Sequence, residues 1–236
     1  MSSTAFLVGG ILPYLAVFVF LVGVVYRLRV WQHVPQPAPM TLYPTEGPGL
    51  GALVKEALFF PSLFRGDKTM WLLSWSFHAA LALALVGHLR GVTGLLDRGL
   101  GSVGFGPQGM ETLSAIAGGG AGIVLSVAVL TLLLRRVFVA RVREISKAPD
   151  FLALLLLAAV ITCGNLMRFG EPPLDLAVTR TWAASLLALS PVVPANPAFL
   201  LHLLFAEVLM LYFAFSKLMH FGGFFFTFSL LKRSQS

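Results

Sequence analysis

Charge and cysteine are both scarce in this 236-residue chain, and each shortage excludes a class of protein. Only 11% of the residues are charged while 57% are hydrophobic, which is far from the composition of a soluble domain. The single cysteine, Cys163, excludes a disulfide framework, a multi-cysteine zinc site and an iron–sulfur cluster held by this chain. We expect Cys163 to be a small packing residue. A basic folded domain is also missing, so the net charge of +7 does not indicate nucleic-acid binding.

Five apolar segments are long enough to cross a bilayer as helices. A span needs roughly 20 apolar residues to cross about 30 Å of hydrocarbon, and the alternating pattern of barrel strands is missing. The first segment has no basic residues before it, which favours a retained helix over a signal peptide. The sequence therefore predicts an all-α integral membrane protein, with one domain over residues 1–236 and helices at about 4–26, 70–89, 112–134, 150–167 and 198–219.

Lys and Arg gather in alternate loops of this predicted topology. Thirteen of the 17 lie in the first loop, the third loop and the C-terminal end, and the other two loops hold four. Because positive charge marks cytoplasmic segments, we expect the N-terminus outside and the C-terminus in the cytoplasm. The loop 27–69 is then cytoplasmic, and "LGALVKEALFFPSLF" within it predicts a short interfacial helix. Membrane lipid and a partner protein are the expected contacts of this basic face. Its basic residues are Arg27, Arg29, Lys55, Arg65, Lys68, Arg135, Arg136, Arg141, Arg143, Lys147, Lys217, Lys232 and Arg233.

Four of the five histidines lie within predicted helices, where an imidazole without a partner is costly. His78 and His88 are about 15 Å apart along the second helix, and His202 and His220 about 27 Å apart along the fifth, so neither pair can share one metal ion. The two helices run in opposite directions. His88 and His202 therefore lie at one depth near the outer surface, and His78 and His220 at another near the inner surface. Eighteen residues make five turns, which predicts His202 and His220 on one face of a continuous helix. His33 is expected in the cytoplasmic loop.

Two histidine pairs between apolar, antiparallel helices are suited to two b-type hemes, each held by two imidazoles. Covalent c-type attachment is excluded because CxxCH is missing. Arg90 and Lys217 are the candidate partners of the heme propionates. Two hemes at two depths form an electron path across the bilayer, which suits transfer between a lipid-soluble quinol and a water-soluble partner. The chain has no catalytic constellation of its own, so it would oxidise quinol while partner subunits carry out the terminal chemistry.

Several segments resemble one family over nearly the whole chain: "ILPYLAVFVFLVG", "AIAGGGAGIVLSVAVLTLLLRRVFVARVR" and "HLLFAEVLMLYFAFSKLMHFGG". Together with the ten- and eighteen-residue histidine spacings, they are similar to the gamma subunits of respiratory nitrate reductase, which are five-helix diheme cytochromes b. The resemblance implies an outer heme on His88 and His202 and an inner heme on His78 and His220.

Within this family, "EALFFPSLFRGDKTMWLLSWSFHAALALALVGHLR", "FSKLMHFGG" and the long first loop are more similar to a second branch. These are the membrane cytochromes of complexes linked to dissimilatory sulfite reductase and of the related Hme and Tmc complexes. That branch implies a cytoplasmic iron–sulfur partner resembling heterodisulfide reductase, with further membrane and extracytoplasmic redox subunits. Menaquinone is the expected quinone, although the sequence does not distinguish it from ubiquinone. The branch also implies anaerobic respiration of sulfur compounds at the cytoplasmic (inner) membrane of a prokaryote. The alternative, the nitrate reductase branch, implies a ferredoxin-like beta subunit and a molybdenum alpha subunit.

The quinone site is less well specified. The family's quinol-contacting lysine has no counterpart in "GVTGLLDRGLGSVGFGPQGMET", where Gln108 and Met110 lie near its position. Glu207, the only acidic residue deep in the membrane, is a candidate proton acceptor for the quinone site or a hydrogen-bond partner of another helix.

Two further hypotheses come from other classes. The chain could be a transporter that uses its buried histidines as metal ligands, or a structural anchor that has lost its hemes. The small residues of "AGGGAG", at 117–122, are expected to allow a neighbouring helix or a heme ring to approach closely.

Overall fold

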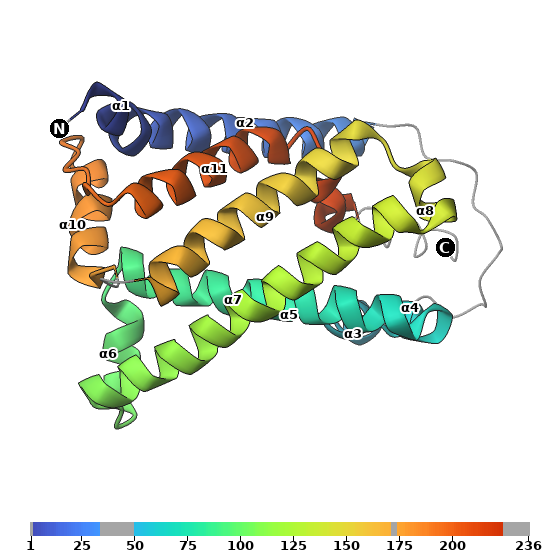
Figure 1. Ribbon diagram of the computed structural model, residues 1–236, viewed down its shortest axis with the longest axis horizontal. Helices are drawn as coiled ribbons and strands as arrows, with labels where there is room; N and C mark the ends of the chain where they lie inside the picture. The colour runs from blue at the N-terminus through green and yellow to red at the C-terminus, as the bar shows by residue number, and fades with distance from the viewer. Residues whose placement is uncertain (1, 34–49, 171–173, 224–236) are drawn as a thin grey trace.

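The regular structure of the described residues is helical. The computed structural model describes residues 2–33, 50–170 and 174–223. Long helices run side by side along the molecule, and short helices lie across or beyond their ends (Figure 1). The short helices α6 (Leu95–Ser102) and α10 (Leu176–Leu187) lie at one end, which we name the α6 end. The helices α3 (Leu50–Phe59), α4 (Pro61–Gly66) and α8 (Ala140–Ile145) lie at the other, the α8 end.

Four helical segments are long and apolar enough to span a membrane, and a bent pair makes a fifth. The chain is therefore a multi-pass membrane protein, as predicted. The segments extend beyond the predicted limits. Three of them are single helices, namely α5 (Lys68–Val92), α7 (Pro107–Phe138) and α9 (Ala148–Phe169). The first predicted helix, 4–26, extends as a helical segment over Ser3–His33. His33 is consequently the last residue of α2 (Leu12–His33) and not a loop residue.

The first span contains a π-helical turn, η1 (Leu7–Ile11), between α1 (Ser3–Phe6) and α2. Pro13 explains it, because proline has no N–H to donate to the carbonyl four residues earlier. That carbonyl belongs to Gly9, and it accepts a 2.7 Å hydrogen bond from the indole N–H of Trp182 on α10. A tryptophan from α10 thus replaces the helical donor that the sequence removes.

A closely packed core lies between α5, α7 and α9. Its buried cluster consists of Phe77, Ala80, Ala121, Leu125, Ala128 and Val129, in which small residues let the helices come close. Gly122 of the "AGGGAG" segment faces Asn165 of α9, whose side-chain amide donates to the Gly122 carbonyl at 3.2 Å and to the Ser126 hydroxyl at 2.9 Å. The predicted close approach of a neighbouring helix at this glycine-rich segment is confirmed.

The fifth predicted helix is not continuous, which corrects the expectation for 198–219. Helix α11 (Pro197–Phe213) ends before a turn, and the segment Lys217–Gly223 continues at 72° to it. The Ser216 side chain accepts from the Leu218 N–H and begins the 3₁₀ turn η2 (Lys217–Met219). A serine that caps a new turn competes with continuation of the old helix. The argument that five full turns place His202 and His220 on one helix face was therefore wrong.

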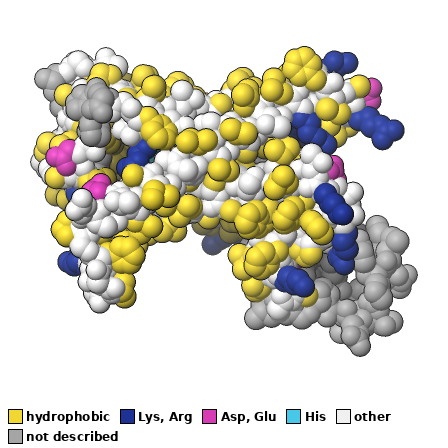
Figure 2. Space-filling view, turned by 60° about the horizontal axis from the view of Figure 1, so that its bottom comes forward, with side chains coloured by type: hydrophobic (Ala, Val, Ile, Leu, Met, Phe, Trp, Pro, Cys, Tyr) yellow, Lys and Arg dark blue, Asp and Glu magenta, His cyan; other side chains and the backbone are white. Residues whose placement is uncertain are grey.

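The first loop carries the predicted short helix, but in two pieces. Helices α3 and α4 meet at Phe60, whose φ of 49° and ψ of 46° interrupt the helical path. Residues 34–49 of this loop, together with Lys232 and Arg233, lie outside the described residues. Hydrophobic side chains cover the middle of the molecule in Figure 2, while Lys and Arg gather mainly toward the α8 end.

Candidate functional site

The structure brings four of the histidines together as two facing pairs. The imidazole centroids of His88 on α5 and His202 on α11 are 5.9 Å apart, with an angle of 15° between the ring planes. Those of His78 on α5 and His220 are 5.8 Å apart, with ring planes at 81°. The His88–His202 pair lies toward the α6 end and the His78–His220 pair toward the α8 end. The juxtaposition predicted from depth alone is thus observed, although α11 is bent.

Each imidazole of the two pairs is oriented by a backbone carbonyl that faces its Nδ1 atom. His78 and His88 bond the carbonyls four residues earlier, at 2.7 and 2.6 Å. His202 bonds Val160 of α9 at 2.9 Å, and His220 bonds Lys217 at 3.2 Å. Because a carbonyl only accepts, Nδ1 carries the proton and Nε2 is left as a metal-binding nitrogen.

The separation of the rings fits a metal ion held between them. Two metal–nitrogen bonds of about 2.0–2.1 Å, together with the distance from each nitrogen to its ring centre, come to roughly 6 Å. The observed centroid distances of 5.8 and 5.9 Å agree with that sum. Because each pair supplies only two protein ligands, the site suits a metal whose other ligands come from a planar group such as heme.

Helix α9 contributes to the His88–His202 pair without supplying a ligand. A Cβ at Gly164 would lie 3.3 Å from Cε1 and 3.4 Å from Nδ1 of His202, so glycine leaves the space that this imidazole occupies. The Val160 carbonyl lies one helical turn earlier and accepts from the same ring. His202 is therefore positioned by two helices, and no sequence motif indicates the roles of Val160 and Gly164.

Aromatic rings surround His78. The rings of Phe60 and Phe77 each meet its imidazole edge to face, with centroid distances of 5.4 and 5.3 Å. Such perpendicular contacts are favourable and restrict the ring. Phe60 belongs to the connection between α3 and α4, so a segment of the first loop reaches this pair. Sequence reasoning missed this contact because no motif marks it.

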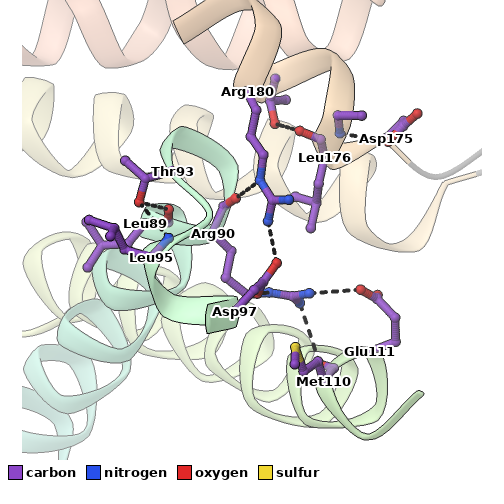
Figure 3. A network of polar contacts seen from close by, with 12 residues as sticks. Leu89, Arg90, Thr93, Leu95, Asp97, Met110, Glu111, Asp175, Leu176 and Arg180 are labelled. Atoms are coloured by element: carbon purple, nitrogen blue, oxygen red, sulfur yellow. Dashed lines mark hydrogen bonds and ion pairs between the residues drawn. The ribbon is translucent and has the colours of Figure 1, made fainter. Parts of the chain in front are cut away.

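A network of ion pairs is centred on Arg90, two residues after His88 on α5 (Figure 3). Arg90 is buried and donates to the Asp97 carboxylate, to Glu111 at 2.9 Å and to the Met110 carbonyl at 3.5 Å. Arg180 of α10 donates to the same Asp97 and to the Arg90 carbonyl, at 2.7 Å. The network joins α5, α6, α7 and α10 at the α6 end. Arg90, a predicted propionate partner, is therefore already held by two carboxylates.

The ionisation of Asp97 follows from this network. Partial burial opposes its charged form, but the hydrogen bonds and charges of Arg90 and Arg180 outweigh burial and hold the pKa of Asp97 below its ordinary value. Asp97 is consequently a carboxylate at neutral pH and acts as the anionic centre of the cluster.

The second propionate candidate, Lys217, is also paired. Its Nζ lies 2.8 Å from the buried carboxylate of Asp150 at the start of α9, and Arg136 of α7 lies 3.9 Å from the same carboxylate. These three side chains, with Leu154 and Tyr212 among others, line a cavity of about 180 Å³ at the α8 end. The Lys217 side chain is 75% exposed, so its ammonium group is free to leave Asp150 for another anionic partner.

The remaining predicted site residues lie apart from one another. Gln108 is exposed in the first turn of α7 at the α6 end, near the Met110 carbonyl that Arg90 contacts. Glu207 is 3% exposed on α11, and among the described residues neither carboxylate oxygen has a hydrogen-bond partner. Cys163 is buried in α9. The roles of Gln108 and Glu207 at a quinone site stay predictions.

Known proteins match this chain over most of its length. Residues 61–235 match the family described as "Nitrate reductase gamma subunit". A protein of Archaeoglobus fulgidus, the "Hdr-like menaquinol oxidoreductase cytochrome b-like subunit", is 33% identical, and the match covers 93% of this chain and 77% of that protein. The protein of the same name from Archaeoglobus profundus is 26% identical, with 92% and 76% covered. The family match covers more than half of the chain, and the chain therefore belongs to the nitrate reductase gamma subunit family.

Proposed function

We propose that this chain is a diheme cytochrome b subunit that carries electrons between menaquinol and a cytoplasmic iron–sulfur partner. The observation that carries the proposal is the two facing imidazole pairs, at 5.8 and 5.9 Å, with every Nδ1 bonded to a carbonyl. A heme bound at each pair supplies one-electron oxidation and reduction. His88 with His202 holds one heme, and His78 with His220 the other.

The names of the relatives favour the menaquinol-linked branch over a nitrate reductase. Both Archaeoglobus proteins are named menaquinol oxidoreductase cytochrome b-like subunits and "Hdr-like". By likeness to them we propose menaquinone as the quinone, a heterodisulfide-reductase-like iron–sulfur subunit as the partner, and sulfur-based anaerobic respiration as the setting. The gamma-subunit role in a nitrate reductase is the second candidate, because the family carries that name.

We also propose that the α8 end faces the cytoplasm, because Lys and Arg gather there and positive charge is retained on that side. Quinol oxidation at the α6 end would then release protons outside while electrons move inward. Single cysteines introduced at Ser146 in the turn after α8 and at Ser102 in α6 test this orientation, since the native Cys163 is buried. A membrane-impermeant thiol reagent applied to right-side-out membrane vesicles should label the Ser102 position alone, and labelling of the Ser146 position alone would reverse the topology.

A competing hypothesis is a metal transporter. The described residues contain no group of three His, Cys, Asp or Glu side chains that would hold a metal ion. Heme content separates the two hypotheses, because a transporter needs no heme.

The deciding experiment is a reduced-minus-oxidised spectrum of the protein purified from its native membrane, with heme quantified per chain. Two b-type hemes per chain are expected, with His78→Ala and His88→Ala each losing a different one. His33→Ala is the matched control, since this histidine lies at the end of α2 and its Nδ1 bonds the Arg29 carbonyl of its own helix. A heme-free wild-type protein would refute the proposal.

The two hemes should also differ spectroscopically. The relative orientation of the two imidazole planes sets how the iron d orbitals split. The near-parallel planes at His88–His202, 15°, and the near-perpendicular planes at His78–His220, 81°, therefore predict two distinct ferric EPR signals. The more anisotropic signal is expected to disappear in His78→Ala. Two identical signals would contradict the ring geometry.

A further inference from the structure

The connection between α3 and α4 contains a strained residue next to a proposed heme ligand. Phe60 has φ 49° and ψ 46°, in the left-handed region that residues with a side chain rarely adopt. Such strain persists only where the surroundings hold the backbone in place, and it concentrates at functional sites. The contacts on either side of Phe60 show what holds it.

Two tryptophans of α5 hold the chain immediately before Phe60. The indole N–H of Trp71 donates to the Phe59 carbonyl at 2.7 Å, and that of Trp75 donates to the Leu58 carbonyl at 3.1 Å. These are two of the last carbonyls of α3, which have no partner within the helix. Both indoles come from the two helical turns before His78, so the end of α3 is attached to the helix that carries this histidine.

The chain after Phe60 is fixed as well. Pro61 begins α4, and the Phe64 N–H donates to the Phe60 carbonyl at 3.0 Å. The Glu56 carboxylate accepts from the Ser62 N–H at 3.2 Å, across the bend. With the backbone held on both sides, the Phe60 ring meets the His78 imidazole at a centroid distance of 5.4 Å, with 86° between the ring planes.

We propose that Phe60 is a positioning residue for the heme held by His78 and His220. Its ring, together with that of Phe77, contacts the His78 imidazole edge to face, fixes the plane of this ring and shields this end of the pair from water. The inference rests on the proposed function, because it assigns Phe60 a role toward that heme. The potential and the ligand geometry of this heme should therefore depend on a residue of the first loop, while the His88–His202 heme should not.

Phe60→Gly tests the inference, because glycine adopts the left-handed conformation without strain and so removes the ring while sparing the backbone. The midpoint potential of the His78–His220 heme is expected to move in the negative direction, since greater exposure to water favours the charged ferric form. Its ferric EPR signal should change as the imidazole plane is freed, and the signal of the other heme should stay. Phe60→Tyr, which keeps the ring edge, should restore both properties.

Phe59→Leu is the matched control, because the Phe59 ring is 54% exposed and its carbonyl remains available to Trp71. This variant should titrate like wild type. If Phe60→Gly binds two hemes with wild-type potentials and EPR signals, the inference is overturned and the proposed function stands. Equal changes at both hemes would also overturn it, because they would indicate a general loss of structure. Absence of heme from the wild type would remove the proposed function and this inference together.

Discussion

Arg90 offers a direct test of whether the α6 end is held by charge or by packing. We consider Arg90→Gln, Asp97→Asn and the double variant. Arg90 is 9% exposed at its side chain and Asp97 22%, so water screens this pair only partly. A hydrogen bond to a charged group contributes about 1.5–3 kcal/mol. The Arg90–Glu111 pair adds about 0–1 kcal/mol, because the Glu111 side chain is 65% exposed.

These figures give an expected loss of about 1.5–4 kcal/mol in the free energy of unfolding for Arg90→Gln. Asp97 is not left unpaired, because Arg180 still donates to it, so a larger loss is not expected. The coupling energy between the two substitutions should lie between about 1 and 3 kcal/mol, as for other neighbours in one network. Unfolding by a denaturing detergent, followed by circular dichroism, measures the free energy of unfolding of the wild type, the two single variants and the double variant.

A coupling energy under about 0.5 kcal/mol would refute this reasoning, since it is the usual deviation from additivity for independent sites. The same variants test the propionate role predicted for Arg90. If Arg90 holds a propionate as well as Asp97, Arg90→Gln should lower the heme content of the His88–His202 pair, while Asp97→Asn should retain it. Equal heme retention in both variants would leave Arg90 a structural residue only.

Three further outcomes are expected. Trp182→Phe removes the donor to the Gly9 carbonyl and should lower the free energy of unfolding by about 1–2 kcal/mol, measured by the same detergent titration; an unchanged value would contradict the role given to this bond. Asp150→Asn should cost no more than about 1 kcal/mol because Lys217 is 75% exposed, yet a redox titration should show a shift at the neighbouring heme alone. The pKa of Asp97 is lower in the folded protein, so its stabilisation is complete above its unfolded pKa of about 3.9 and is lost as the pH falls further. Unfolding measured from pH 6 to 3 should show that loss in wild type and less of it in Asp97→Asn.

The facing of His88 with His202 could be predicted from the sequence because helical rise is fixed, whereas His220 meets His78 from a segment beyond the bend that the sequence did not indicate. A residue's depth in a membrane follows from its position along a helix, whatever the tilt of the neighbours. Depth alone does not give the rotation of a side chain about the helix axis. The angles of 15° and 81° between the ring planes therefore emerged only from the structure.

Other features depend on contacts between residues far apart in the chain. Arg90 meets Asp97, Glu111 and Arg180 across sequence separations of 7, 21 and 90 residues, and no local pattern encodes that meeting. The break after Phe213 was missed for a different reason. Neither proline nor glycine marks it, and the Ser216 cap that begins the next turn resembles an ordinary polar residue in the sequence.

The bend that follows α11 has a consequence for how the protein is assembled. In one straight rod, a shift of His202 would carry His220 with it. At 72° to each other, the segments that carry His202 and His220 do not form one helical rod. If each pair holds a heme, as we propose, a small shift of α11 at His202 need not displace His220, and an assembly intermediate that holds one heme can keep the other pair of imidazoles in place.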